Sequence, residues 1–331
     1  MEIRQLGKTG LTVTPIGLGL AALGRPGYIN IKHAEDLEQD YDVKTMEQHA
    51  HQVLDAAWQS GIRYFDAARS YGNAEAFLAS WLTACRIHPG EVSVGSKWGY
   101  TYTADWRVDA PIHETKEHSL EVLRRQRRES DANLGQYLGL YQIHSATLDS
   151  GVLKNQDVLS ELVRYRDNGL IIGLTLSGPG QAETLLHAMK IIENGRPLFE
   201  CVQATWNLLE QSSGKALKAA HEKGLGVIIK EALANGRLTA KNDEPAFAQK
   251  RGLLEEVAGE QKTTIDALAL AAVLAQPWVD VVLSGAATRE QLFSNVAATK
   301  LVRNEELGKK LAGIVEPPQE YWKKRSSLRW N

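Results

Sequence analysis

Residues 64–82 read YFDAARSYGNAEAFLASWL and combine the two kinds of pattern that decide the fold. The apolar, aromatic start is typical of a short buried strand, which ends on an acid, Asp66. A turn containing Tyr71 and Gly72 follows, and apolar residues then recur at the spacing of an amphipathic helix. We therefore expect this stretch to form one strand–turn–helix unit.

The same order of strand and helix recurs along the whole chain. Strand-like runs occupy residues 15–20, 62–67, 91–97, 138–144, 170–176, 199–205, 225–230 and 279–285. Helical patterns lie between them at 44–61, 74–86, 113–134, 156–169, 181–195, 213–224 and 263–276. Alternating units of this kind predict parallel strands joined by right-handed crossovers. Eight of them in a chain of this length suit a closed (β/α)8 barrel, which usually takes about 250 residues.

An open, doubly wound sheet is the structural alternative to the barrel. A dinucleotide site in such a sheet needs a G-x-G-x-x-G motif at the start of a helix, and the nearest match, residues 17–24, has Ala22 where the third glycine belongs. We therefore favour the α/β class with a (β/α)8 TIM barrel, as one domain over residues 1–331. An N-terminal β-hairpin over residues 2–17 and an additional helical segment at the C-terminus are expected outside the barrel.

Composition and charge exclude several classes of protein. The chain has 331 residues and a formal net charge of −2, which gives no reason to expect nucleic acid or an anionic membrane as a partner. The basic run 124–128 is flanked by glutamates and is expected to be a solvated helix face. Two cysteines cannot form a disulfide framework, and no signal-like or membrane-spanning apolar run occurs. The sequence thus predicts a soluble, cytoplasmic protein.

Ionisable side chains stand at the ends of three consecutive predicted strands. Asp66 ends the second strand, with Tyr71 in the loop after it, Lys97 ends the third strand and His144 ends the fourth. Each one alone has an ordinary structural explanation, such as a turn cap or a buried aromatic residue. In a barrel, however, the carboxyl ends of all strands face one mouth, where functional groups gather.

The four side chains together suit acid–base chemistry at a carbonyl group. A phenol has a pKa near 10 in water and is a weak acid at neutral pH. A lysine ammonium nearby favours the phenolate, and a carboxylate keeps the lysine charged and in place. An imidazole can orient a carbonyl oxygen or share its proton. The set Asp66, Lys97, Tyr71 and His144 therefore predicts a tuned general acid/base.

At these residues the sequence resembles the aldo-keto reductase superfamily. The resemblance rests on Asp66-x4-Tyr71-Gly72, on Lys97 at a strand end and on the segment 140–145, LYQIHS. Segments 4–13, 203–209 and 285–295 are similar to other recurring parts of the family. The resemblance implies a (β/α)8 barrel that binds a nicotinamide dinucleotide without a Rossmann domain. It also implies hydride transfer to or from the carbonyl carbon of a small aldehyde, ketone or sugar.

The resemblance further implies a role for each matching residue. Tyr71 would be the general acid for reduction and the base for oxidation, Lys97 would lower its pKa, Asp66 would pair with Lys97, and His144 would orient the substrate oxygen. Trp206 would stack on the nicotinamide, and Thr175 and Gln203 would hold its carboxamide. The other residues implied in cofactor binding are Gly19, Leu20, Lys230, Leu233, Gly236, Arg237, Ser284, Gly285, Arg289, Gln291 and Asn295.

The loop after the third strand is the expected wall of the substrate pocket. Residues 98–113 carry several aromatic side chains at the barrel mouth, of which Trp98, Tyr100 and Trp106 are the candidates. The same region contains His113, Glu114 and His118, but the spacing H-E-x3-H does not match a zinc helix, so no metal site is expected.

Several departures from the family pattern lie in the expected cofactor site. Leu176, Glu231 and Ala232 replace residues that commonly contact the dinucleotide, and Arg289 stands one position later than the usual basic residue. NADP(H) is the favoured cofactor, with Arg289 as the candidate to reach its 2′-phosphate, and NAD(H) is the other choice. The departures leave open a dinucleotide-binding regulatory or sensor barrel with slow turnover. An unrelated barrel hydrolase is disfavoured, because the chain lacks a nucleophile elbow and paired carboxylates.

Overall fold

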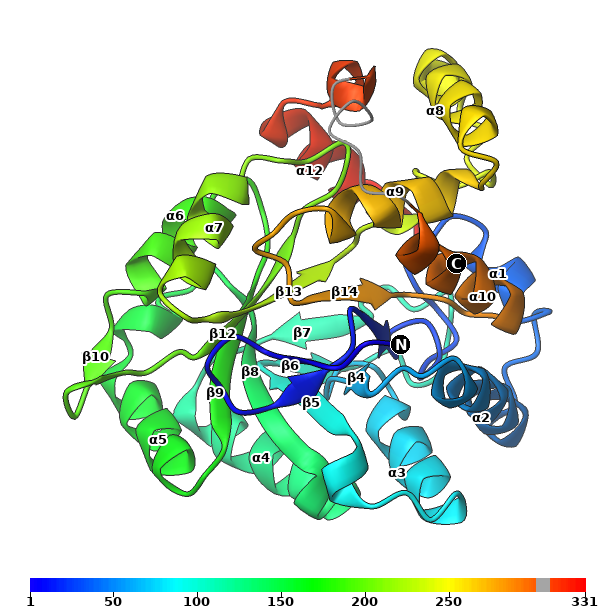
Figure 1. Ribbon diagram of the computed structural model, residues 1–331. Coiled ribbons are helices and arrows are strands. Elements are labelled where there is room, and N and C mark those ends of the chain that lie inside the picture. The colour runs from blue at the N-terminus through cyan, green and yellow to red at the C-terminus, as the bar shows by residue number, and fades with distance from the viewer. Residues whose placement is uncertain (302–309) are drawn as a thin grey trace.

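The computed structural model describes residues 1–301 and 310–331 of the chain. Its centre is a closed barrel of parallel strands that follow one another around the barrel in chain order. The strands are β3 (Ile16–Gly19), β4 (Tyr64–Asp66), β5 (Ser93–Trp98), β8 (Leu138–Ala146), β9 (Ile171–Leu176), β12 (Cys201–Thr205), β13 (Gly226–Lys230) and β14 (Val281–Ser284). The predicted (β/α)8 barrel is confirmed (Figure 1).

Helices surround the barrel on its outside (Figure 1). They are α1 (His33–Asp36), α2 (Val43–Gln59), α3 (Ala74–Ala84), α4 (Leu120–Leu134), α5 (Gln156–Asp167), α6 (Gln181–Ala188), α7 (Gly214–Glu222), α8 (Ala248–Glu260), α9 (Ile265–Leu274), α10 (Arg289–Ala297) and α12 (Pro318–Ser326). Side chains cap the starts of α2, α4, α5, α9 and α10; at α2 the Asp42 carboxylate accepts from the amides of Lys44 and Thr45. The additional C-terminal helix that the sequence predicted is α12.

Apolar side chains fill the interior of the barrel and the space between its strands and the surrounding helices. Inside it, Tyr64, Leu140 and Ile228 are fully buried with side chains of the N-terminal hairpin. On the outside, alternate strand residues such as Leu18 and Phe65 pack against the helices in the main core. The barrel closes where β14 pairs with β3, with Val282 opposite Ile16.

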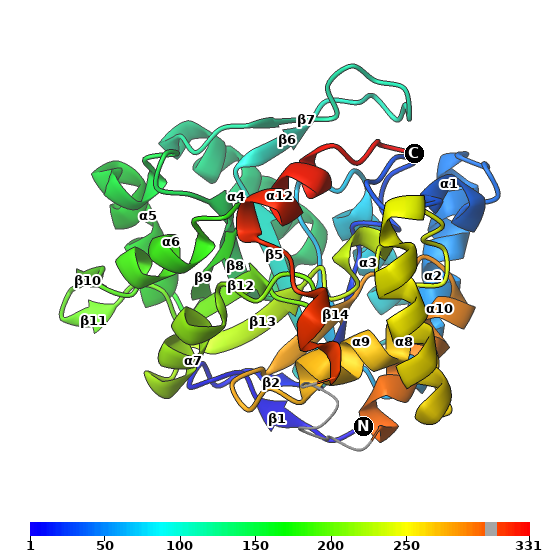
Figure 2. The ribbon, with the colours of Figure 1, turned by 90° about the horizontal axis from the view of Figure 1, so that it is seen from above.

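A short hairpin, β1 (Arg4–Gln5) with β2 (Thr12–Val13), covers one end of the barrel. Its Leu6 is fully buried and lies so close to Gly226 that a Cβ there would come within 2.5 Å of the Leu6 side chain. Figure 2 shows the hairpin at one end and β6, β7 and α12 at the opposite end. Because β6 (Tyr100–Tyr102) begins two residues after β5 ends, that opposite end is the carboxyl end of the strands.

Two predicted helices are shorter than expected. Residues 113–119 are not helical, because β7 (Glu114–Lys116) pairs antiparallel with β6 and the Ser119 hydroxyl caps α4 at the amide of Val122. Helix α6 ends at Ala188, and β10 (Ile192–Glu193) pairs with β11 (Arg196–Pro197) around Asn194 and Gly195. Both turn residues have positive φ, as an Asn-Gly hairpin requires. Helices α1, α8 and α10 were not predicted.

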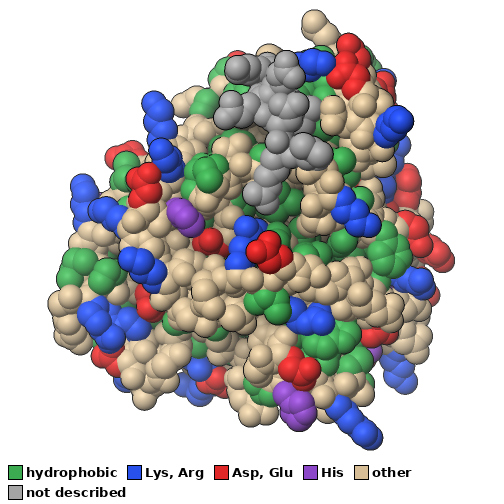
Figure 3. Space-filling view, in the orientation of Figure 1, with side chains coloured by type: hydrophobic (Ala, Val, Ile, Leu, Met, Phe, Trp, Pro, Cys, Tyr) green, Lys and Arg blue, Asp and Glu red, His purple; other side chains and the backbone are tan. Residues whose placement is uncertain are grey.

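The surface in the view of Figure 3 carries charges of both signs. Lysine and arginine side chains lie interspersed with aspartate and glutamate, and hydrophobic side chains appear between them. In the described part of the chain, none of the helices has the length and apolar character needed to cross a membrane.

Candidate active site

The carboxyl end of the barrel contains a cavity of about 510 Å³. Its walls come from the carboxyl ends of β8 and β12, from the loops after β3, β4, β9, β13 and β14, from β6 and β7, from α9 and α10, and from the C-terminal residues 325–330. Asp66, Tyr71 and His144 line it, and Lys97 lies behind them with a side chain that is not exposed at all. The fold therefore brings the four predicted acid–base residues together.

Asp66 and Lys97 form a buried ion pair at the bottom of this site. The Lys97 ammonium donates to the Asp66 carboxylate and, at 2.8 Å, to the backbone oxygen of Ala67. The other Asp66 oxygen accepts from the hydroxyl of Tyr64 at 3.1 Å and from the amide of Gln203 at 3.0 Å. Strand pairing between β4 and β5 sets this geometry, because each residue ends or nearly ends its strand.

Tyr71 stands over the ion pair on the cavity wall. The Lys97 ammonium lies 4.7 Å from the centre of the Tyr71 ring, and the His144 ring centre lies 5.6 Å from it. Burial, followed by the negative charge of Asp66, raises the pKa of Tyr71 above its usual value, although Arg25 lowers it. Burial therefore outweighs the lowering effect of Arg25, and the expected lowering of this pKa by Lys97 stays a prediction. The phenol stays protonated and is available as a proton donor.

His144 is the neutral member of the set. Burial, followed by the charge of Lys97 and then of other cations, lowers the pKa of His144 well below its usual value. Its Nδ1 is buried and has no hydrogen-bond partner among the described residues. The register of β8 against β9 shifts after Ile143, and Ser145 at this shift has a φ of 51° and donates its amide to the Thr175 hydroxyl at 2.7 Å.

An arginine that the sequence patterns did not indicate lies beside Tyr71. Arg25 is 2% exposed, and its guanidinium carbon is 5.2 Å from the centre of the Tyr71 ring. Its Nη1 donates to the backbone oxygen of Ser70 at 2.6 Å and to the Glu114 carboxylate at 2.9 Å. Trp330 covers the guanidinium at 4.6 Å. No local motif could have found this cluster, because its members come from opposite ends of the chain.

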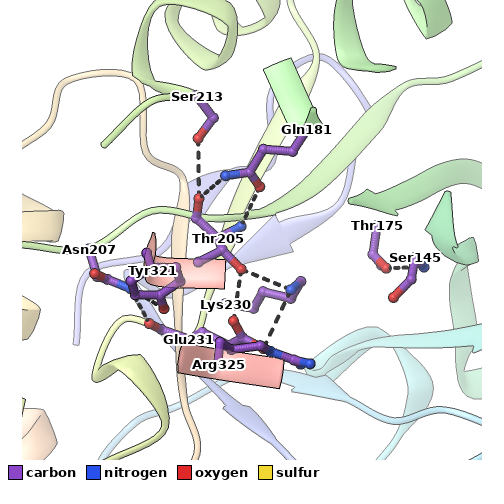
Figure 4. A network of polar contacts seen from close by, with 10 residues as sticks. All are labelled: Ser145, Thr175, Gln181, Thr205, Asn207, Ser213, Lys230, Glu231, Tyr321 and Arg325. Atoms are coloured by element: carbon purple, nitrogen blue, oxygen red, sulfur yellow. Dashed lines mark hydrogen bonds and ion pairs between the residues drawn. The ribbon is translucent and has the colours of Figure 1, made fainter. Parts of the chain in front are cut away.

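A second polar network, drawn in Figure 4, ties the end of β13 to α12. Glu231 has a φ of 54° and is bound by Arg325 at 2.7 Å and by the Thr205 hydroxyl at 3.0 Å. Lys230 donates to the same hydroxyl at 2.9 Å. Burial alone would raise the pKa of Glu231, but Arg325 and Lys230 hold it at about 2, whereas burial lowers the pKa of Lys230 to about 8. The acid at position 231 is thus offset mainly by Arg325, which no sequence pattern indicated.

The predicted cofactor residues divide into two groups. Those that line the cavity are Gly19, Gln203, Lys230, Leu233, Gly236, Ser284, Gly285, Gln291 and Asn295. Those that do not line it are Leu20, Thr175, Trp206, Arg237 and Arg289.

Packing explains why the second group lies elsewhere. Leu20 is buried and donates its amide to the backbone oxygen of Asp66, and the Thr175 hydroxyl accepts from the amide of Ser145. Trp206 is 6% exposed and packs edge-on against Trp278 with ring centres 5.6 Å apart, so it is a core residue. Arg289 is exposed in the first turn of α10.

Arg237 is occupied by a buried ion pair. Its two terminal nitrogens donate to the Glu316 carboxylate at 3.0 and 2.7 Å, and both side chains are 3% exposed. Lys250 adds a third contact to Glu316 at 2.8 Å. Burial alone would raise the pKa of Glu316, but the hydrogen bonds from Arg237 and Lys250 hold it at about 2. Arg237 therefore fastens the segment before α12 to the barrel.

This ion pair predicts a pH dependence of stability. A carboxylate whose pKa is lower in the folded state stabilises the fold above the unfolded pKa, near 4.5, and loses that contribution as pH falls toward about 2. We expect Glu316→Gln to lower the free energy of unfolding at pH 7 by on the order of 1–3 kcal/mol. The difference in unfolding free energy between the variant and the wild type should shrink as the pH falls from about 4.5 to 3, measured by urea titration. Glu320→Gln, exposed on α12, is the control; equal losses at every pH would contradict the prediction.

The expected substrate wall is only partly present. Tyr100 lines the cavity, with its ring centre 4.9 Å from that of His144. Trp98 is fully buried and packs edge-on against His118, because it points to the opposite side of β5 from Lys97. Trp106 lies outside the cavity lining and donates its indole N–H to the backbone oxygen of Tyr41 at 2.6 Å. Trp98 and Trp106 are therefore not wall residues here.

The cavity has features that fit a nicotinamide dinucleotide. It extends from Tyr71 to the first turn of α9 and to α10, where Asn295 lies in the second turn. The Asn295 amide nitrogen donates to Ser284 at 2.9 Å, while its Oδ1 is buried and has no hydrogen-bond partner among the described residues. An unpaired buried acceptor in a cavity wall is costly unless a ligand supplies a donor. Adenine carries such a donor on its exocyclic amine, so the residues present fit the group.

A parallel (β/α)8 barrel with a tyrosine, a histidine and a Lys–Asp pair at its open end defines a class of barrel oxidoreductases. The sequence profile of the aldo/keto reductase family matches residues 15–316. The chain therefore belongs to the aldo/keto reductase family, and the protein is an oxidoreductase enzyme.

Individual relatives are distant but cover almost the whole chain. Pyridoxal 4-dehydrogenase of Microbacterium luteolum is 26% identical, over 89% of this chain and 92% of its own. L-galactose dehydrogenase of Arabidopsis thaliana is 25% identical, over 96% and 95%. The structure of an aldo-keto reductase from Bacillus halodurans, in a holo form, superimposes with a TM-score of 0.71 at 20% identity, covering 96% and 97% of the two chains. This last likeness shows the shared fold.

Proposed function

We propose that this enzyme reduces a small aldehyde, ketone or sugar carbonyl with a nicotinamide dinucleotide and catalyses the reverse alcohol oxidation. The observation that carries the proposal is the phenol of Tyr71 on the cavity wall, above the buried Lys97–Asp66 pair and beside neutral His144. The family generally uses nicotinamide cofactors, and the unpaired acceptor on Asn295 supports such a ligand.

The chain's own side chains would hold and move the proton. The nicotinamide, when bound, supplies or accepts the hydride at the carbonyl carbon. Tyr71 donates its hydroxyl proton to the carbonyl oxygen in reduction and takes it back in oxidation. The Lys97 ammonium favours the phenolate that this step leaves, and Asp66 holds Lys97 in place. His144, neutral at physiological pH, is placed to hydrogen-bond the substrate oxygen.

A polar substrate suits the walls near Tyr71. Arg25 with Glu114 and Lys230 with Glu231 present donors and acceptors, and Tyr100 and Trp330 present aromatic faces. The names of two relatives refer to pyridoxal and to L-galactose, which supports a small polar aldehyde or sugar for this chain as well.

The sequence left open a barrel that binds the dinucleotide as a sensor. One reason was the acid at position 231, which would oppose a pyrophosphate. Its ion pair with Arg325 removes much of that objection. A binding module also has no need of a buried Lys–Asp pair beneath a tyrosine, so the catalytic function is the better supported of the two.

A substrate screen tests the proposal. Purified protein is mixed with NADH or NADPH and a panel of sugars, small aldehydes and ketones, and nicotinamide absorbance is followed. We expect at least one carbonyl substrate to be reduced with kcat on the order of 1 s⁻¹ or more. Binding of the dinucleotide without turnover on any member of the panel would favour the sensor.

A further inference from the structure

Charge is distributed unevenly along the cavity. Among the described residues, the cations that line it are Arg25, Lys230, Lys241 and Arg325. The acids that line it are Asp36, Asp66, Glu114, Glu231, Asp266 and Glu290. Acids therefore outnumber cations, and their positions decide what kind of ligand each end accepts.

At the Tyr71 end every acid is balanced by a cation. The pairs are Asp66 with Lys97, Glu114 with Arg25, and Glu231 with Arg325. Lys230 adds a further cation 3.7 Å from Glu231. This end, where the reaction takes place, thus has no excess of negative charge.

The far end, between α9 and α10, has two acids without such partners. Asp266 lies in the first turn of α9 and Glu290 in the first turn of α10. The start of α9 lies against the second turn of α10, because the hydroxyls of Thr264 and Ser294 are 3.0 Å apart. Within residues 1–301 and 310–331, no cation lies within ion-pair distance of Asp266 or Glu290.

The geometry of the two helix starts favours negative charge at both positions. The first turn of a helix favours a carboxylate, because its free amides and the helix dipole are positive there. Backbone and Thr288 hydrogen bonds lower the pKa of Glu290. The far end of the cavity is therefore negative.

If the proposed function holds, this end receives the adenosine half of the cofactor. A dinucleotide with its nicotinamide beside Tyr71 must extend along the cavity to α10, where Asn295 offers its unpaired acceptor. We propose that Asp266 and Glu290 make the site selective for NAD(H) over NADP(H). The inference rests on the proposed function and concerns its cofactor.

The two cofactors differ only at the adenosine ribose. NADP(H) carries a 2′-phosphate with a charge between about −1.5 and −2 at pH 7, whereas NAD(H) has a neutral hydroxyl there. Carboxylates repel the phosphate but accept a hydrogen bond from the hydroxyl. The two carboxylates thus weaken the binding of NADP(H) and can hydrogen-bond the ribose of NAD(H).

Two cations could in principle reverse this preference. Lys241 lines the cavity, but its ammonium contacts Asp36. Arg289, on which the sequence-based expectation of NADP(H) depended, is exposed and absent from the lining. The Lys241 ammonium is thus already paired, and the exposed Arg289 does not lie against the cavity wall; both can be tested.

The test measures binding of each cofactor to the full chain without substrate. NADH and NADPH are titrated separately, followed by calorimetry and by quenching of tryptophan fluorescence. We expect the dissociation constant of NADPH to be roughly tenfold or more above that of NADH at low salt. The ratio should narrow as salt rises from about 50 to 500 mM, because Glu290 is exposed to screening.

Charge-removing variants identify the responsible residues. Glu290→Gln and Asp266→Asn should each lower the ratio of the NADPH dissociation constant to that of NADH. The double variant should lower this ratio most, mainly through tighter NADPH binding. Glu121→Gln, an exposed acid in the first turn of α4, is the matched control and should leave the ratio unchanged.

Three results would overturn the inference alone while leaving the proposed function standing. They are NADPH binding as tightly as NADH, an unchanged ratio in the double variant, and a selective loss of NADPH affinity in Lys241→Met or Arg289→Ala. Failure of both cofactors to bind would instead reject the proposed function, and this inference with it.

Discussion

Replacing Tyr71 by phenylalanine is expected to lower kcat for carbonyl reduction by roughly 10²- to 10⁴-fold. The substitution removes one oxygen and its proton while it keeps the ring that packs beside His144 and above Lys97. The substrate oxygen then has no acid of suitable position to protonate it. Steady-state kinetics with the best substrate of the screen, together with cofactor titration, separates this loss from a loss of binding.

Tyr100→Phe is the matched control for this variant. Tyr100 lines the same cavity and approaches the same histidine, with ring centres 4.9 Å apart, but it is not above the Lys97–Asp66 pair. We expect kcat for Tyr100→Phe to stay within about tenfold of wild type, which is well below the effect of losing a general acid. A Tyr71→Phe enzyme with near-normal kcat would remove Tyr71 from the proton-transfer step.

Lys97→Met should impair both activity and stability. The Lys97 side chain is 0% exposed and that of Asp66 is 2% exposed, so the substitution leaves a buried carboxylate without its cation. Breaking a buried pair in this way costs about 3–5 kcal/mol of unfolding free energy. The phenolate of Tyr71 also loses the positive charge 4.7 Å from its ring, so kcat should fall by roughly 10²-fold or more.

A double variant distinguishes the two effects of Lys97. Asp66→Asn combined with Lys97→Met removes the uncompensated charge and should recover much of the stability, measured in urea, but not kcat. Lys218→Met, an exposed lysine on α7 with 63% side-chain exposure, controls for loss of a lysine as such. The assignment fails if the single variant is as stable as wild type or if the double variant regains normal kcat.

The strand and helix patterns of the sequence were sufficient for the architecture. Strand-like runs such as 62–67 and 138–144 each contain a barrel strand. A short apolar run bounded by polar residues is typical of a buried strand when strand and helix patterns alternate along the chain. The errors concern local boundaries. Residues 114–116 pair with β6 instead of starting a helix, and Asn194-Gly195 makes a hairpin turn, for which an Asn-Gly pair is a typical signal.

The alternation of side chains along a strand also explains why one expected wall residue, Trp98, lies elsewhere. Neighbouring side chains on a strand point to opposite sides, so Lys97 and Trp98 cannot both face the centre of the barrel. Placing Lys97 at the acid–base site therefore excludes Trp98 from the same wall, which agrees with its burial against His118.

By itself, the sequence determined the barrel and the convergence of Asp66, Tyr71, Lys97 and His144. Parallel strands in a closed barrel bring their carboxyl ends together, so the topology alone makes residues at these strand ends neighbours. Only the tertiary structure decided that Arg25 and Trp330 flank Tyr71, that Arg325 neutralises Glu231, and that unpaired acids face the far end of the cavity. These contacts join loops and a C-terminal helix that are far apart in the sequence. They depend on packing across the whole chain, and such long-range packing produces no local periodic pattern in the sequence.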